Sequence, residues 1–369
     1  MKVAIIIDSL ASGGSERQAA LAAIEVARRG ADVHIITVHA RNDFAESLAR
    51  ASVKCVTLGK LHFARLLKIA SIAGYLRKEK FDIVHCFKSR PSTYGRLAAK
   101  MARIPTVFGG FRQNRPDGRL INWLNRLLTR GTSGWIVNSQ SARDMVSKAL
   151  KIAPDRVFVV PNAIDPGLLL ATASTRDEAT RLLGLPDRTP IVTIVAHLRR
   201  EKNHLMFLRV ARKILDLGVE AIFLCAGEGP EKEKLVGHCR AMELQTRVRF
   251  LDLVSDVPTL LKATDVCVLT SLSEALPNAL IEASFLGVPC VSTDNGGAAE
   301  VIRPGHTGFI VPVNDDDAMA HRVVQLIQDK SLRQRIGESA RLDALRRFAL
   351  DRSVTSLLNV YNGMTRKDI

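Results

Sequence analysis

The chain has 369 residues, which is enough for two ordinary α/β domains with separate cores. Hydrophobic residues make up 47% of it, and it contains no low-complexity tract, which excludes extensive disorder. No uninterrupted apolar stretch approaches the roughly 20 residues that span a bilayer, and the apolar run at the N-terminus ends at Asp8. We therefore expect a folded, cytoplasmic protein without an integral membrane segment.

The net charge of +16 is concentrated in the first half of the chain. Residues 1–176 contain 28 Lys and Arg against 12 Asp and Glu, whereas residues 177–369 contain 25 of each. Such an asymmetry indicates a polyanion, an anionic membrane surface or an acidic substrate as a partner of the first half. A basic composition without a binding role is the alternative.

The first half alternates short β-branched runs with longer amphipathic stretches, a pattern typical of alternating strands and helices. A helix is predicted from Glu16 to Arg29, where alanine and isoleucine recur at helical spacing. The predicted strands occupy residues 3–7, 33–38, 82–87, 106–110, 135–139 and 157–162.

A second alternating series follows in the other half of the chain. Its predicted strands occupy residues 191–198, 221–229, 248–252, 266–271, 289–293 and 308–313. Nearly continuous apolar strands are buried on both faces, as in a parallel sheet covered by helices. The sequence therefore predicts an α/β fold of two doubly wound, Rossmann-like domains, with the linker between residues 165 and 190.

Ligands of doubly wound sheets bind beyond the carboxyl ends of the strands, so the residues after each strand are candidates for a site. After the first strand, Gly13 and Gly14 precede a helix whose free amides would attract an anion. The alternative is a flexible turn that is capped by Ser15.

The first strand of the second half ends in a cluster of cations. Arg199, Arg200 and Lys202 together could neutralise a diphosphate without a metal ion. A solvated basic turn is the alternative interpretation. Glycines follow later strands at Gly227, Gly229, Gly296 and Gly297, and we expect them to allow a close approach of the backbone to a ligand or to the other domain.

The segment from residue 271 to residue 302 carries the most specific signal. Glu274 follows a strand, and a helix begins near Asn278 and places Glu282 one turn inside it. A carboxylate there can accept hydrogen bonds from the two hydroxyls of a ribose, while the amides of Asn278 and Ala279 face a phosphate. Glu274 would then lie near a transferred sugar. Alternatively, the two acids only complement the helix dipole.

These motifs resemble the large family of retaining glycosyltransferases with the GT-B fold, known as family 4 or group 1. The resemblance covers almost the whole chain and rests on GGSER, VNSQS, PNAID, VAHLRREKN, GEGP and above all EALPNALIE, which is followed by GVP and NGGAAEV. It implies an acceptor-side domain in residues 1–170 and a nucleotide-sugar domain in residues 171–350, which face each other across a cleft. Residues 351–369 resemble the family's C-terminal helix, which crosses back to the first domain.

The resemblance also implies roles for single residues. In the family the first glutamate, here Glu274, contacts the donor sugar, the second, here Glu282, binds the ribose, and the lysine, here Lys202, binds the diphosphate. Gly13 and Gly14 would lie across the cleft, beside the donor phosphate.

The predicted sites follow from the motifs and from this resemblance together. The predicted donor site consists of Gly13, Gly14, Arg199, Lys202, Gly227, Glu274, Leu276, Asn278, Ala279 and Glu282. The predicted catalytic residues are Glu274, Lys202 and His85.

Two departures from the family pattern affect these assignments. The family usually has G-R-L where this chain has Ala196, His197 and Leu198, so either His197 or Arg199 would replace the usual basic residue at the diphosphate. Many members carry H-x-H where His85 is followed by Cys86 and Phe87. His85 is therefore either a residue on the catalytic side or an ordinary packed histidine.

We expect neither a metal ion nor another cofactor. The triplet at residues 315–317 resembles a D-x-D metal motif but lies at the start of a helix, where aspartates act as N-caps. The six cysteines form no C-x-x-C pair and are expected to be buried, reduced thiols.

The predicted function is transfer of a sugar, with retention of configuration, from a UDP- or GDP-linked donor to a glycan or lipid-linked acceptor. The resemblance favours bacterial polysaccharide or lipopolysaccharide assembly. The alternatives are a nucleotide-sugar epimerase on the same fold, which needs no acceptor, and a basic nucleic-acid-binding protein. The basic half lacks an aromatic-interleaved recognition motif, so we expect no nucleic acid as a partner.

Two basic amphipathic segments, at residues 60–80 and 119–130, combine Leu, Ile, Phe or Trp with Lys and Arg. Helices of this kind can lie in the headgroup region of an anionic membrane. Peripheral attachment to the inner face of the cytoplasmic membrane is therefore one prediction. The alternative is that the apolar faces of both helices pack on the sheet.

Overall fold

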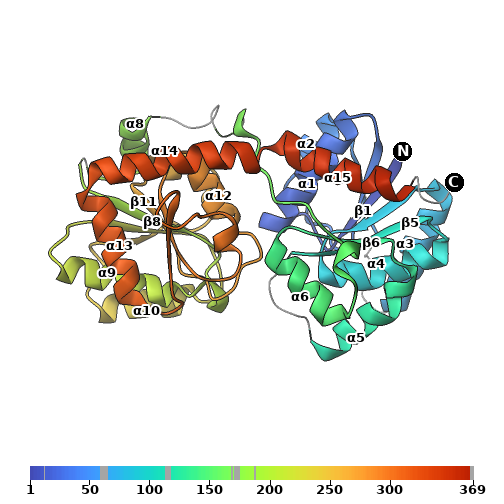
Figure 1. Cartoon of the computed structure of the whole chain (residues 1–369), viewed down its shortest axis with the longest axis horizontal. Helices are drawn as coiled ribbons and strands as arrows, with labels where there is room; N and C mark the ends of the chain where they lie inside the picture. The colour runs from blue at the N-terminus through green and yellow to red at the C-terminus, as the bar shows by residue number, and fades with distance from the viewer. Residues whose placement is uncertain are drawn as a thin grey trace. The chain divides into compact units, whose positions relative to one another are not determined.

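The computed structural model describes residues 1–11, 13–58, 65–112, 118–167, 169, 175–186 and 188–365. The chain divides into two compact units (Figure 1). Unit 1 consists of Met1–Asn162 and Asp351–Ile369, and unit 2 of Ala163–Leu350. The division between the units follows Asn162, whereas the sequence predicted the domain boundary at residue 170.

The sheet of unit 1 is parallel throughout and has seven strands in the order β3-β2-β1-β4-β5-β6-β7. Its strands are β1 (Lys2–Ile7), β2 (Asp32–Thr37), β3 (Lys54–Thr57), β4 (Ile83–Cys86), β5 (Thr106–Phe111), β6 (Gly134–Val137) and β7 (Val157–Val159). Six of them were predicted. The edge strand β3 was missed because it is short and no residue in it is buried, so it lacks an apolar run.

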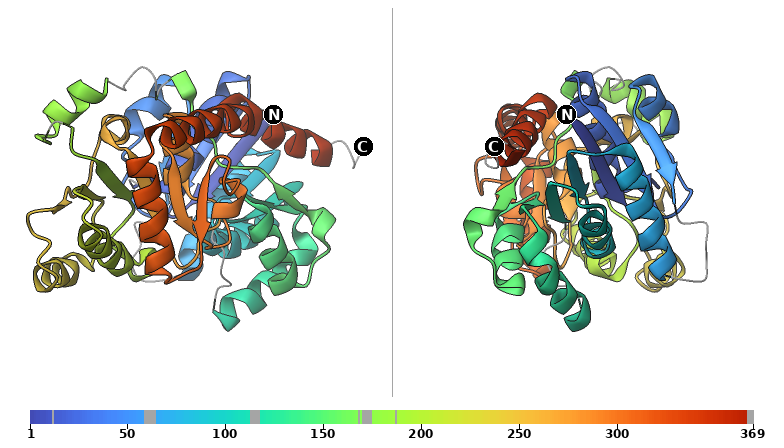
Figure 2. Two further views of the ribbon diagram at one scale, coloured as in Figure 1. Left: turned by 60° about the vertical axis from the view of Figure 1, so that its left-hand side comes forward. Right: turned by 90° about the vertical axis from the view of Figure 1, so that its right-hand side faces the viewer.

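Helices cover both faces of this sheet (Figures 1 and 2). They are α1 (Gly14–Arg28), α2 (Ala45–Arg50), α3 (Arg65–Glu79), α4 (Ser89–Ala102), α5 (Arg119–Leu127), α6 (Gln140–Leu150) and α15 (Leu350–Thr365), with the 3-10 turns η1 (Leu128–Gly131) and η2 (Pro154–Arg156). Helices α3 and α4 share a core cluster with Val84 and Cys86 of β4. His85 alternates with them, and its ring contacts Tyr361 of α15.

Unit 2 has a six-stranded parallel sheet in the order β10-β9-β8-β11-β12-β13. Its strands are β8 (Ile191–Val195), β9 (Ile222–Ala226), β10 (Val248–Phe250), β11 (Val266–Leu269), β12 (Cys290–Thr293) and β13 (Gly308–Val311). Its helices are α8 (Arg176–Leu182), α9 (His204–Asp216), α10 (Lys232–Ala241), α11 (Val257–Ala263), α12 (Asn278–Phe285), α13 (Asp316–Gln328) and α14 (Lys330–Arg347), with the 3-10 turns η3 (Arg200–Lys202) and η4 (Ala298–Glu300). All six predicted strands are present, with shorter ends. The residues beyond these ends form the loops of the candidate site.

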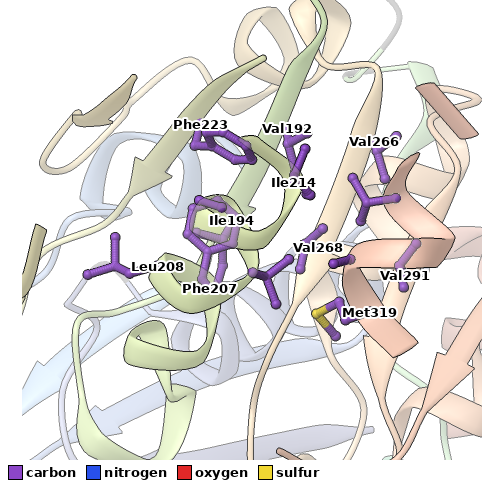
Figure 3. Packing of buried hydrophobic residues seen from close by; sticks show 14 of the residues in the cluster. Val192, Ile194, Phe207, Leu208, Ile214, Phe223, Val266, Val268, Val291 and Met319 are labelled. Carbon is purple, nitrogen blue, oxygen red and sulfur yellow. The ribbon is translucent and has the colours of Figure 1, made fainter. Parts of the chain in front are cut away.

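The largest core cluster of unit 2 lies between this sheet and helices α9 and α13 (Figure 3). Ile194 of β8 packs with Phe207 of α9, and Met319 of α13 packs in the same cluster. Burial of each such side chain contributes about 1.5–3 kcal/mol. The strands therefore hold the loops at their carboxyl ends in fixed positions.

Among the residues that the structure describes, no helix is both long and apolar enough to cross a membrane.

Candidate functional site

The candidate site of unit 2 lies where the strand order reverses, at the carboxyl ends of β8 and β11. Two hydrogen bonds tie the loops that follow these strands. The Thr270 hydroxyl donates to the Lys202 carbonyl oxygen at 2.9 Å, and the Leu272 amide donates to the Glu201 carbonyl oxygen at 2.8 Å. Residues about 70 positions apart in sequence are thereby held side by side.

An ion pair links the two principal residues of this site. The Lys202 Nζ atom lies 2.5 Å from the Glu274 Oε1 atom, and the Ser271 hydroxyl donates to the same oxygen at 2.7 Å. The side chains of Lys202 and Glu274 are 23% and 13% exposed. The pair is therefore shielded enough for its electrostatics to be strong, yet a ligand can still reach it.

The loop after β12 supports Glu274 from the other side. The Glu274 amide donates to the Asn295 carbonyl oxygen at 2.9 Å, and Glu274 forms an isolated parallel bridge with Gly296. A Cβ atom at Gly297 would overlap the carbonyl oxygen of Ala275. Gly297 is therefore required by the packing of two loops of unit 2.

Helix α12 carries the remaining donor-site candidates. Its N-cap residue, Pro277, forms no side-chain capping hydrogen bond, and the amides of the first helical turn have no acceptor within the helix. Asn278 and Ala279 are partly exposed there. Glu282 is only 5% exposed, and burial of a carboxylate is costly unless it has hydrogen-bond partners. These residues surround the same end of the sheet as Glu274.

Two other donor-site candidates, Gly227 and Leu276, have structural roles within unit 2, as does the neighbouring Gly229. Gly227 adopts φ +144°, and a Cβ atom there would overlap the carbonyl oxygen of Ala196. A Cβ atom at Gly229 would overlap the carbonyl oxygen of Leu198. Both glycines therefore allow two backbone segments of unit 2 to approach each other closely. The sequence predicted a close approach to a ligand or to the other domain. The Leu276 side chain belongs to the core, so only its backbone can face a donor.

The predicted cation cluster is divided in the structure. Lys202 is partly buried against Glu274, whereas Arg199, Arg200 and His197 are exposed. The His197 Nδ1 atom lies 3.4 Å from the Glu228 carbonyl oxygen, on the β9 side of the site. Lys202 is thus the cation that the fold places beside the glutamate motif.

In unit 1, the glycine turn after β1 contains an ion pair that the sequence did not reveal. Helix α1 begins at Gly14, with Gly13 as N-cap in an extended conformation, so the alternative of a cap at Ser15 is wrong. Glu16, in the first turn, pairs with Lys88, which follows β4. The positive end of α1 therefore already has a carboxylate nearby.

His85 is buried and packed in unit 1, as in the alternative that the sequence left open beside a catalytic role. It is 1% exposed, and its Nδ1 atom lies 2.8 Å from the Tyr361 hydroxyl. Its ring also packs against Phe87 and Phe108. Burial, with a smaller effect of Arg112, lowers the pKa of His85 to about 3, so the ring is neutral at physiological pH.

The aspartate triplet has structural partners, as its position at a helix start indicated. Asp315 caps α13 by accepting a hydrogen bond from the Ala318 amide at 2.9 Å. Asp316 pairs with Arg209, and Asp317 with Lys213. Within the described part of the chain, no group of three or more His, Cys, Asp or Glu could hold a metal ion. Five cysteines are buried as expected, whereas Cys55 is exposed.

Comparisons with known proteins define the class of this chain. The sequence model of the family described as glycosyl transferases group 1 matches residues 175–343, and that of glycosyltransferase family 4 matches residues 12–168. The two matches correspond closely to unit 2 and unit 1. Both are glycosyltransferase families, which supports transfer over the epimerase and nucleic-acid alternatives.

Two curated relatives extend this finding. The chain is 30% identical, over 72% of its length and 71% of the relative, to UDP-Gal:alpha-D-GlcNAc-diphosphoundecaprenol alpha-1,3-galactosyltransferase of Escherichia coli. It is 26% identical, over 82% of its length and 79% of the relative, to N-acetyl-alpha-D-glucosaminyl L-malate synthase of Bacillus anthracis.

Solved structures show the same fold. The Anabaena protein HepE in complex with UDP-glucose superposes with a TM-score of 0.89 at 19% identity, covering 98% of this chain and all of the other. The lipopolysaccharide outer core galactosyltransferase WaaB superposes with a TM-score of 0.74 at 17% identity, covering 98% and 99%. The protein is thus an enzyme with the GT-B fold. It belongs to the group 1, or family 4, glycosyltransferases, which are of the retaining type.

Proposed function

We propose that this enzyme transfers a hexose from a UDP-linked donor to a lipid-linked sugar diphosphate during assembly of a bacterial polysaccharide. The Escherichia coli relative is named for a UDP-galactose donor and a diphosphoundecaprenol-linked acceptor. The structurally similar HepE is described in complex with UDP and UDP-glucose. These names support UDP over GDP as the donor nucleotide, which the sequence left open.

In this proposal unit 2 holds the donor through the residues at the carboxyl ends of β8 and β11. Lys202 and the first amides of α12, at Asn278 and Ala279, neutralise the diphosphate, and Arg199 adds a solvent-facing cation. Glu282 accepts hydrogen bonds from the ribose hydroxyls, and Glu274 contacts the transferred sugar. Gly13, Gly14, Gly227 and Leu276 stay predicted donor contacts through their backbone.

The chemistry proposed for the site is positioning and electrostatic stabilisation. When the bond between sugar and diphosphate breaks, negative charge develops on the leaving UDP. The Lys202 ammonium is held in place beforehand by Glu274 and by the loop contacts, so little reorganisation is needed at that moment. We propose neither a protein nucleophile nor a metal ion for this step.

The observation that carries the proposal is the ion pair between Lys202 and Glu274, since it joins the cation and the glutamate of two separate motifs. A direct test is thermal unfolding of the protein in the presence of nucleotides and nucleotide sugars. UDP and one UDP-hexose should raise the unfolding midpoint by mass action, and GDP should not. Transfer of that hexose to a GlcNAc diphosphate lipid completes the test. A protein stabilised by no nucleotide would contradict the proposal.

We also propose that α5 attaches unit 1 to an anionic membrane. Trp123 and Leu127 lie one turn apart on this helix and are 55% and 58% exposed, so they do not pack on the sheet. Arg126 and Arg130 follow on the same segment and are exposed as well. Attachment of this kind would bring the enzyme to a lipid-linked acceptor.

The second amphipathic segment behaves differently in its described part. Residues 60–64 lie outside the described residues. In α3, Ile72, Ala73 and Leu76 are buried in the core of unit 1, although Leu67 is 52% exposed. For this helix the packing alternative holds, and the membrane proposal rests on α5.

A further inference from the structure

Arg112 directly follows β5 and lies at the carboxyl edge of the sheet of unit 1. Its guanidinium lies over the ring of Phe87, 3.9 Å from the centroid, which places it beside the end of β4. Its Nη1 atom donates to the Asn162 Oδ1 atom at 2.6 Å. The guanidinium plane is therefore fixed by an aromatic face and by one amide oxygen.

A short hydrogen-bond chain positions that amide. The Asn138 Nδ2 atom donates to the same Asn162 Oδ1 atom at 3.3 Å, and the two asparagines are 3% and 5% exposed. Since the Asn162 oxygen can only accept, the Asn138 amide must present its nitrogen to it. Among the described residues, the Asn138 Oδ1 atom is buried without a hydrogen-bond partner. Such an oxygen calls for a donor that this part of the chain does not supply.

The charge of Arg112 is also uncompensated in the described part of the chain. No carboxylate there forms an ion pair with it, whereas Lys88, after the neighbouring strand β4, pairs with Glu16. Burial lowers the pKa of Arg112 to about 9, which indicates how costly the isolated charge is.

Another arginine of unit 1, the fully buried Arg96, shows what a purely structural role looks like. Arg96 is 2% exposed and donates to Ser92, Thr132 and twice to Asn125, so its nitrogens are used by the protein. The described residues give Arg112 a single acceptor, so most of its five donors have no acceptor among them. The contrast between the two arginines points to a ligand at Arg112.

We infer that Arg112 binds a phosphate group of the acceptor, with Asn162 and Asn138 as positioning residues. The inference rests on the proposed function, which gives unit 1 an acceptor that carries a diphosphate. A guanidinium matches the geometry of phosphate oxygens through paired N–H groups. The Asn138 Oδ1 atom can accept a hydrogen bond from a hydroxyl group. A sugar phosphate offers both a phosphate for Arg112 and a hydroxyl for Asn138. Arg112 would thus select phosphorylated acceptors over neutral glycans.

The test measures stabilisation by inorganic phosphate in protein that also carries Lys202→Gln, which weakens the proposed donor phosphate site. Adding Arg112→Gln should raise the phosphate concentration for half-maximal stabilisation about 10-fold or more, because a charge-assisted contact is lost. Adding Arg50→Gln, which removes an exposed arginine of α2 in the same unit, should leave it unchanged. Equal responses with and without Arg112, or no response in the Lys202→Gln protein, would overturn the inference.

A second variant guards against a folding defect in Arg112→Gln. Asn162→Asp keeps the shape of the side chain and gives Arg112 a carboxylate partner, which should compete with phosphate and weaken its binding. A purely structural Arg112 would leave phosphate binding unchanged in this variant. When Lys202 is kept, stabilisation by UDP should persist in Arg112→Gln and in Asn162→Asp. If UDP does not stabilise the parent protein, the proposed function is contradicted. The inference on Arg112 is decided by the phosphate titrations alone.

Discussion

The carboxyl edges of the two sheets use charge in different ways. In unit 2, Lys202 pairs with Glu274, and the pair is braced by Ser271 and by the loop after β12. In unit 1, Lys88 pairs with Glu16, while Arg112 has no acidic partner among the described residues. The sheet edge of unit 2 therefore presents Lys202, whose charge is neutralised by Glu274. The sheet edge of unit 1 presents Arg112, whose charge no acidic group of the described residues neutralises.

The comparison suggests a division of labour. The second half of the chain has equal numbers of acidic and basic residues, and its site depends on a few precisely placed groups. The first half carries the entire positive excess, which suits recognition of an anionic acceptor and of a membrane. Each prediction below tests one side of this division.

The largest effect is expected at Glu274. Glu274→Gln keeps the shape of the side chain but removes the charge that holds Lys202, so kcat should fall about 100-fold or more. The KM for the donor should change little. Steady-state rates of sugar transfer measure both, and Glu233→Gln, at an exposed position of α10, is the matched control. A variant with parental kcat would remove Glu274 from the catalytic machinery.

At Glu282 the effect should fall on binding. Glu282→Ala should weaken UDP binding about 10- to 150-fold, because each hydrogen bond to a charged group contributes roughly 1.5–3 kcal/mol. Calorimetric titration with UDP gives the dissociation constant, and circular dichroism checks that unit 2 still folds around the shortened side chain. Unchanged affinity in a folded variant would show that Glu282 does not hold the ribose.

Unit 1 provides the next prediction, on α5. Replacing Trp123 and Leu127 with Ser should lower partitioning onto anionic liposomes about tenfold, because both side chains would leave the membrane interface. Cosedimentation at low and high salt is the measurement, and binding should also fall as salt screens the cations. Leu182→Ser, at a 70% exposed position of unit 2, is the control. If the parent protein does not bind anionic liposomes even at low salt, α5 is no membrane anchor.

The smallest effect concerns stability and pH. Burial, with a smaller effect of Lys202, lowers the pKa of His204 from 6.5 to about 4. The unfolded chain therefore binds more protons than the folded one between pH 6.5 and pH 4, so the free energy of unfolding falls as the pH falls through this window. The slope from one histidine is at most about 1.4 kcal/mol per pH unit.

Denaturant unfolding across this window measures the effect. His204→Leu should flatten the pH dependence of the unfolding of unit 2, whereas His238→Gln, at an exposed position, should leave it unchanged. An equally steep slope in His204→Leu would mean that other groups cause the acid sensitivity.

The sequence predicted the fold closely because buried parallel strands are nearly continuous apolar runs. It missed β3, whose Lys54 and Cys55 are exposed at the edge of the sheet. Unit 2 begins at Ala163 because of the tertiary contacts of the chain, which the composition of the sequence does not reveal.

The site was predicted less completely, because partners distant in sequence decide each role. Nothing in the local sequence distinguishes Lys202 from Arg199, since the choice depends on hydrogen bonds from Thr270 and Leu272. The surroundings of His85 depend on Tyr361, a partner 276 positions away. The glutamate motif could be recognised because its residues lie on one continuous loop and helix.

The central claim is that side-chain cations and helix amides of unit 2 hold the donor diphosphate without a metal ion. Titration of the protein with UDP after thorough chelation, in the presence of EDTA, tests it most directly. We predict that UDP binds the parent protein with the same affinity with and without EDTA. Lys202→Ala should weaken binding, whereas Lys213→Ala, which breaks the exposed pair with Asp317, should not. Binding that disappears in EDTA and returns with manganese or magnesium would contradict the account.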